Sequence, residues 1–191
     1  KKLAIVLMML FPVILFGAST NISGVTDDTT KTYKNIDGVT MDNNTSYTVT
    51  GVGVAVTVLY DFNIDNKNGI TINVLNGASL IVNGDFITKN NVTINVDDSS
   101  IFSILGNLQA KNGSALTISG VMDVAGDVFV EQKAYFDINE GGSLAVDGSL
   151  SVVETGTIEL DGDLSVGEDL YLGNGAHLNG TGTVTAGSYS G

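Results

Sequence analysis

The sequence contains no cysteine, no arginine and no tryptophan, and it has one histidine and one proline. Without cysteine the chain forms no disulfides and no zinc–thiolate site. Eight lysines face 21 acidic residues, which gives a net charge of −13. Nucleic-acid binding needs a cationic surface, so the composition argues against this class of function. An anionic membrane surface would also repel the chain.

Hydrophobic and glycine content place the chain among folded proteins. Of its 191 residues, 43% are hydrophobic and 24 are glycine. This is too apolar for a disordered chain, despite the net charge. The length is sufficient for one domain with a substantial core.

The N-terminus has the pattern of an export signal over residues 1–19. Lys1 and Lys2 precede an apolar run from Leu3 to Phe16, and small residues follow it. A charged start, a short apolar core and a small-residue exit are typical of signal peptides. The run is shorter than the ~20 residues of a membrane helix. We therefore expect a secreted protein without a membrane span in its mature form. A retained anchor and a buried core helix are the alternatives.

An internal repeat begins at ITINV, residues 70–74, and returns as VTINV at residues 92–96. Each unit contains three short segments in which apolar and polar residues alternate, the pattern of a half-buried strand. The apolar positions of the three segments recur every 20 or 22 residues, in these series: Ile72, Ile94, Leu116, Phe136, Ile158 and Leu178; Leu80, Phe102, Met122, Leu144 and Leu164; Phe86, Leu108, Val128, Leu150 and Leu170.

Three strands in 20–22 residues predict one coil of a β-solenoid, because one coil cannot bury its apolar face but stacked coils can. The predicted fold is therefore all-β, a three-sided parallel β-solenoid (β-helix). We assign residues 50–191 to the solenoid and residues 20–49 to an N-terminal cap or an irregular first coil. A 22-residue spacing extended backwards aligns Val52 with Val74 and Tyr60 with Val82.

A glycine column precedes the third segment of the coils, where glycine would permit positive φ angles. Its members are Gly84, Gly106, Gly126 and Gly148. The next position reads Asp85, Asn107, Asp127, Ser149 and Asp169. Acids on adjacent coils would repel one another, so this alternation is interpreted as spacing the charges apart.

An outward column of the third segment carries an apolar residue on every second coil, namely Ile87, Phe129 and Tyr171. These three residues are the candidate partner-binding site. Isolated exposed apolar residues are also common on protein surfaces, which is the alternative interpretation.

No residue pattern indicates catalysis or a cofactor. His177 is expected on the surface, and one histidine supports neither a triad nor a histidine metal site. Asp161 and Asp163 could contribute to a calcium site, but the repeated calcium motif of β-helices is absent, which favours a solvated acidic patch. We expect a protein that is not an enzyme and has no catalytic residue, metal site or cofactor.

The repeat, with ITINV, VTINV and GGSLAVDGSLSV, resembles the β-solenoid proteins of bacterial cell surfaces, which include autotransporter passengers and filamentous-haemagglutinin-like proteins. The resemblance covers roughly residues 50–190 and implies a surface rod, an adhesin or a fibre subunit. The corners GDF, GDV and GEDL are also similar to those of bactofilins, which are cytoskeletal β-solenoids.

The expected function is structural. We expect a secreted, cell-surface subunit of an extracellular fibre or surface layer, which associates with itself end to end or laterally through exposed strand edges. The alternative is an adhesin that binds a glycan or a host surface protein through one face of the solenoid.

Overall fold

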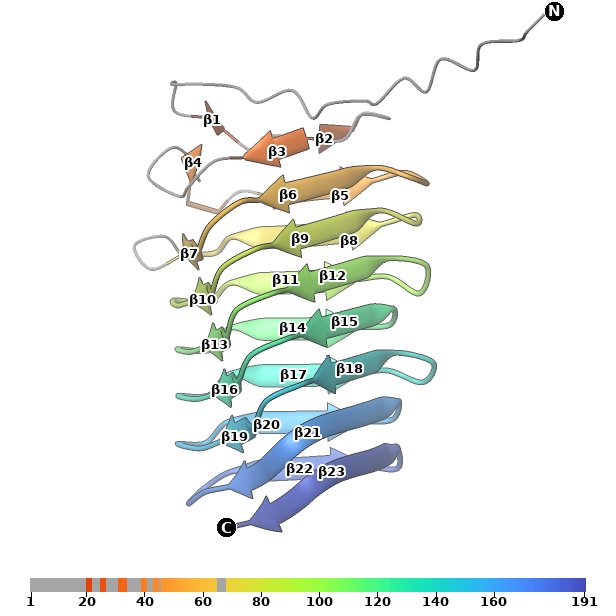
Figure 1. Cartoon of the computed structure of the whole chain (residues 1–191). Coiled ribbons are helices and arrows are strands. Elements are labelled where there is room, and N and C mark those ends of the chain that lie inside the picture. Colours follow the sequence, from red (N-terminus) through yellow and green to blue (C-terminus); the bar gives the residue numbers. More distant parts are fainter. Residues whose placement is uncertain are drawn as a thin grey trace, which may run out of the picture.

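The computed structural model describes residues 20–21, 25–26, 31–33, 39–40, 43–44, 46–64 and 68–191. All regular structure in these residues is β-strand, and the strands form a parallel β-solenoid of about six turns (Figure 1). This confirms the predicted fold class. No helix among the described residues is long and apolar enough to cross a membrane.

Three stacks of parallel strands make up the solenoid. The first contains β2 (Val25–Thr26), β5 (Ser46–Thr50), β8 (Thr71–Leu75), β11 (Thr93–Val96), β14 (Ala115–Ile118), β17 (Tyr135–Ile138), β20 (Thr157–Leu160) and β22 (His177–Gly180). The second contains β3 (Lys31–Tyr33), β6 (Ala55–Val58), β9 (Ser79–Val82), β12 (Ile101–Ile104), β15 (Val121–Val124) and β18 (Ser143–Val146). The third contains β7 (Phe62–Ile64), β10 (Phe86–Thr88), β13 (Leu108–Ala110), β16 (Val128–Val130) and β19 (Leu150–Val152).

The last two coils join the second and third stacks, because β21 (Asp163–Leu172) and β23 (Thr183–Ser190) each run through both. Glu168 lies within β21, where earlier coils have a glycine at a corner. At the other end, β1 (Thr20–Asn21) and β4 (Val39–Thr40) form a separate parallel pair. Residues 1–19, the predicted export signal, lie outside the described residues.

The observed register matches the predicted ladders. Ile72 pairs with Ile94, Leu80 with Phe102, and Phe86 with Leu108, each 22 residues apart. Residues at these positions are at most 3% exposed from Ile72 to Leu170. Each Leu, Ile, Val or Phe buried in this way contributes roughly 1.5–3 kcal/mol. The rings of Phe62, Phe86 and Phe102 also pack on one another, with centroids 5.1 and 5.2 Å apart.

The predicted register of the coil before residue 70 is wrong. Val49 pairs with Val74 and Val58 with Val82, so this coil is longer than 22 residues, with spacings of 25 and 24. The additional residues lie in the corners, where they do not disturb the strands. Val52 and Tyr60 are therefore 89% and 54% exposed, instead of pointing into the core.

The conformational freedom of glycine does not explain the glycine column. None of its four glycines has a positive φ. A side chain is excluded there because the previous coil is too close. A Cβ on Gly106 would lie 2.5 Å from the Oδ1 of Asp85 and 2.6 Å from the backbone carbon of Gly84. Glycine is thus required for close approach between coils.

Positive φ angles occur at other corners, among them the corner between the third and first stacks. Two successive residues adopt them in each of four coils: Asn90 and Asn91, Asn112 and Gly113, Gln132 and Lys133, Glu154 and Thr155. Asn and Gly tolerate this conformation well, whereas a β-branched threonine does so at a cost. Among these four coils the β-branched residue in this conformation is Thr155, with a φ of 67°, and the next coil has Gly175 at this corner, with a φ of 76°.

Candidate functional site

The candidate site lies on the third face, defined as the outward side of the third stack and of the second half of β21. Strand pairing places the predicted residues Ile87, Phe129 and Tyr171 in one column along the solenoid axis, two coils apart. Pairing extends the column by one position at each end. Read in order, it contains Asn63, Ile87, Gln109, Phe129, Ser151, Tyr171 and Ser190.

Polar and apolar residues therefore alternate over seven consecutive coils. Ile87 and Phe129 are partly exposed, and Tyr171 is 41% exposed. The Tyr171 ring extends toward Gly173, where an added Cβ would be 3.0 Å from Tyr171 Cε1. The role of Ile87, Phe129 and Tyr171 in partner binding is still a prediction.

One flank of the column is the series of Asp, Asn and Ser residues that precedes it by two positions. In Asp85, Asn107, Asp127 and Ser149 the side-chain oxygen accepts a hydrogen bond from a backbone N–H one coil further along, whereas Asp169 accepts from the hydroxyls of Ser188 and Ser190. Asp85 accepts from Asn107 at 2.7 Å, Asn107 from Asp127 at 2.8 Å, and Asp127 from Ser149 at 2.9 Å. Every member of this series thus has a side-chain oxygen that accepts a hydrogen bond. The sequence interpretation considered only the spacing of the charges and missed this property.

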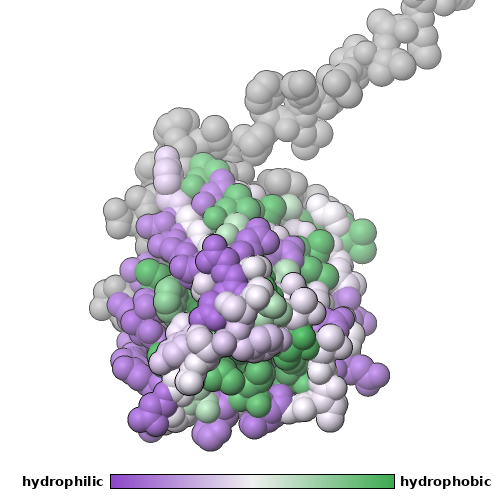
Figure 2. Space-filling model, turned by 60° about the horizontal axis from the view of Figure 1, so that its bottom comes forward, coloured by the Kyte–Doolittle hydropathy of each residue, from purple (hydrophilic) through white to green (hydrophobic). Residues whose placement is uncertain are grey.

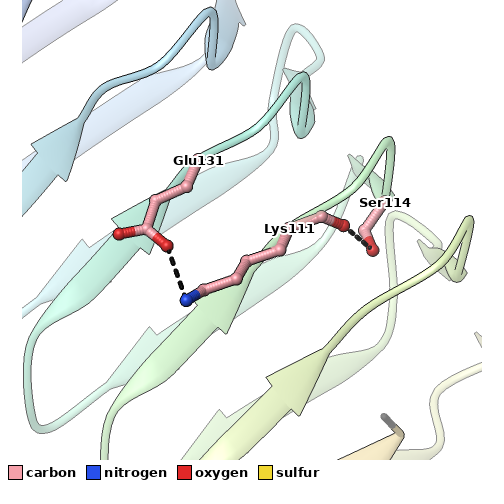
Figure 3. A network of polar contacts seen from close by, with 3 residues as sticks. All are labelled: Lys111, Ser114 and Glu131. Atoms are coloured by element: carbon pink, nitrogen blue, oxygen red, sulfur yellow. Dashed lines mark hydrogen bonds and ion pairs between the residues drawn. The ribbon is translucent and has the colours of Figure 1, made fainter. Parts of the chain in front are cut away.

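The other flank carries an ion pair. Lys111 Nζ lies 3.0 Å from a carboxylate oxygen of Glu131 on the next coil (Figure 3). The buried Ser114 hydroxyl donates to the Lys111 carbonyl at 2.7 Å and closes the adjacent corner. This pair is partly exposed, so its contribution to stability is small, about 0–1 kcal/mol.

The second face, the outward side of the second stack, exposes an apolar patch that sequence reasoning missed. Ile101 and Val121 are paired neighbours, 40% and 38% exposed, and Leu105 is 57% exposed. Asp123 lies on the same face. Partial burial, and then the nearby Asp147 carboxylate, raise the pKa of Asp123. The patch could have been predicted from the apolar residues at positions 101 and 121, which occupy equivalent positions on adjacent coils.

The first face, the outward side of the first stack, is polar. Asn95 donates from its amide to the Asn73 side chain at 2.8 Å, and Asn179 donates to Glu159 at the same distance. Tyr135 is the exposed aromatic residue of this face. Burial, followed by the charges of Asp137, Glu159 and Asp161, raises its pKa.

The acidic residues considered for calcium have separate environments. Asp161 follows β20 and accepts hydrogen bonds from the backbone and hydroxyl of Thr181 at 3.2 and 3.1 Å. Asp163 begins β21 and is exposed. Across the part of the chain that the structure describes, no three acidic or histidine side chains are grouped as a metal site would require. His177 is exposed at the start of β22.

No family model, curated protein or solved structure matches this chain.

Proposed function

We propose that this chain is a structural protein, exported to the cell surface, whose copies stack end to end into a fibre through the edge of β22 and β23. The observation that supports the proposal most directly is the chemistry of this edge. A second copy that adds its strands there would continue the parallel ladders of the solenoid.

The coil that contains β22 and β23 carries no Asp, Glu, Lys or proline. Charged residues and proline are common means of preventing strand addition to an open edge. The preceding coil differs sharply, since it contains Glu159, Asp161, Asp163, Glu168 and Asp169. The edge is thus the place where a chain of net charge −13 can approach another copy with the least repulsion.

The side chains at this end are apolar and incompletely covered. Leu178, Val184 and Ala186 pack against the core but are only partly buried. Tyr189 pairs in register with the buried Leu170, yet it is 62% exposed. Figure 2 brings this end forward, with hydrophobic residues between hydrophilic ones. Another coil would bury these side chains, which favours stacking.

Electron microscopy of the full chain tests this proposal. We expect filaments whose axial repeat is a multiple of about 4.8 Å. Ala186→Lys places a charge at the edge and is expected to abolish them. Ser165→Lys makes the same change in charge on the second face and is the matched control. A charged, proline-containing extension after Gly191 should also prevent assembly.

Discrete particles for the unmodified chain, or equal filaments for both lysine variants, would reject end-to-end stacking. Circular dichroism of each variant shows whether the solenoid is folded, so that a loss of filaments is not mistaken for unfolding.

A second candidate function is a surface adhesin that binds a glycan or a host protein through one face. The alternating column of the third face favours it, because a repetitive column suits a repetitive ligand. This function is compatible with a fibre, since the column and the β22–β23 edge are different surfaces.

A further inference from the structure

We infer that the column of the third face is a binding site for an extended, uncharged, β-1,4-linked polysaccharide that lies along the solenoid axis. The inference rests on the second proposed function, the adhesin, and names its ligand class. It does not depend on end-to-end stacking.

The first argument is the period of the column. Coils are about 4.8 Å apart, so Ile87, Phe129 and Tyr171 recur at roughly 9.6 Å. In an extended β-1,4-linked chain, each sugar advances by about one coil spacing and is turned over relative to the previous one. Every second sugar therefore presents the same face. Apolar side chains on every second coil match this repeat.

The second argument is the chemistry of the alternating positions. The flat apolar face of a sugar packs on aromatic and aliphatic side chains, for which Phe129, Tyr171 and Ile87 are suited. Gln109 and Ser151 lie between them, where sugar hydroxyls would need hydrogen-bonding groups. The Tyr171 side chain is 41% exposed and is therefore accessible to such a ligand.

The third argument is charge. Asp85, Asp127 and Asp169 lie on one flank of the column, and Lys89 and the Lys111–Glu131 pair lie on the other, while the chain as a whole carries −13. A chain of this net charge repels anionic polysaccharides and nucleic acids. Of the stiff polymers with a two-unit repeat, an uncharged glycan fits this column best.

Isothermal titration of the full chain with soluble β-1,4-linked glucose oligomers tests the inference. We expect the hexamer to bind, the dimer to bind at least about tenfold more weakly, and the α-1,4-linked hexamer not to bind, because α-1,4 chains coil and cannot follow a straight column. The double variant F129A/Y171A should lose at least about tenfold in affinity, which is typical of lost aromatic stacking platforms.

Two variants make the result specific. Tyr171→Phe keeps the ring and should keep the affinity, whereas Tyr135→Ala removes an exposed aromatic from the first face and should have no effect. Absence of hexamer binding overturns the inference, as does equal binding by folded F129A/Y171A or by an anionic polygalacturonate. Filaments seen by electron microscopy are a separate readout. A negative titration would therefore not contradict end-to-end stacking, and an absence of filaments would not contradict the glycan site.

Discussion

The Oδ1 atom of Asp85 accepts a hydrogen bond from the backbone N–H of Asn107, one coil further along the chain, at 2.7 Å. The bond ties two coils together at a corner where the strands stop. We expect Asp85→Ala to lower the free energy of unfolding by about 1–3 kcal/mol, as for a lost bond to a charged group. Urea denaturation measures this. Asp98→Ala, which removes an exposed acid, is the control, and an equal effect of the two would contradict the structural role.

Thr88 is a buried threonine in an apolar ladder. Its side chain is fully buried, and its hydroxyl has no hydrogen-bond partner. Thr88→Val keeps the shape and removes the unsatisfied group, so we expect a gain of about 1 kcal/mol. Val130→Thr, two coils away in the same ladder, should be destabilising. Thermal melts of both variants check the pair, and a destabilised Thr88→Val would show that the hydroxyl has a role.

Thr155 has a φ of 67° at a corner. Asparagine tolerates this conformation better than a β-branched residue. Thr155→Asn should therefore stabilise the protein by about 1 kcal/mol and raise Tm by roughly 2–4 °C. Thr157→Asn makes the same change inside β20, where it should give no gain. If both variants melt alike, strain at Thr155 is not the cause.

Asp97 and Asp123 should affect stability with opposite signs. Burial would raise the pKa of Asp97, but hydrogen bonds from the Ser100 side chain and from Asn76 and Ser99 hold it below its usual value of 3.8. Its carboxylate therefore stabilises the fold above pH 3.8, and this contribution disappears as the pH falls through the lowered pKa. Burial and Asp147 raise the pKa of Asp123, so its charge opposes folding near neutral pH.

Thermal melts from pH 7 to pH 2 test this contrast. Asp97→Asn should lower Tm at pH 7, and Asp123→Asn should raise it. The gain for Asp123→Asn should vanish once the pH is below 3.8, where aspartate is protonated in both folded and unfolded chains. The loss for Asp97→Asn should persist to a lower pH. Tm differences that do not change with pH would contradict the assignment.

The sequence predicted the strands and their register from residue 70 onwards because the inward positions of the strands are apolar, with Thr88 as an exception. A shift of one residue would place Thr93 and Asn95 in the core, so no other pairing is acceptable. The same reasoning failed before residue 70, because a corner absorbs extra residues at little cost. Val52 and Tyr60 show that apolar residues at the right interval can still belong to a corner.

The chemistry of the corners was less predictable. Composition did not distinguish a glycine needed for close packing, such as Gly106, from one needed for a positive φ, such as Gly113. Asp85 and Asn107 look like alternating charges in the sequence, but the structure shows them as successive hydrogen-bond acceptors. The candidate column was predictable at Ile87, Phe129 and Tyr171. Its extension to Asn63 and Ser190 required the pairing of coils of unequal length.

The register of this fold also has a mechanical consequence. Each coil contacts only the coil on either side, so an end coil can detach under tension while the rest of the solenoid stays folded. A rod of this kind should come apart coil by coil under force, releasing about one repeat of chain length at each step. Such a molecule would extend in many small steps under load and would not rupture in a single unfolding event.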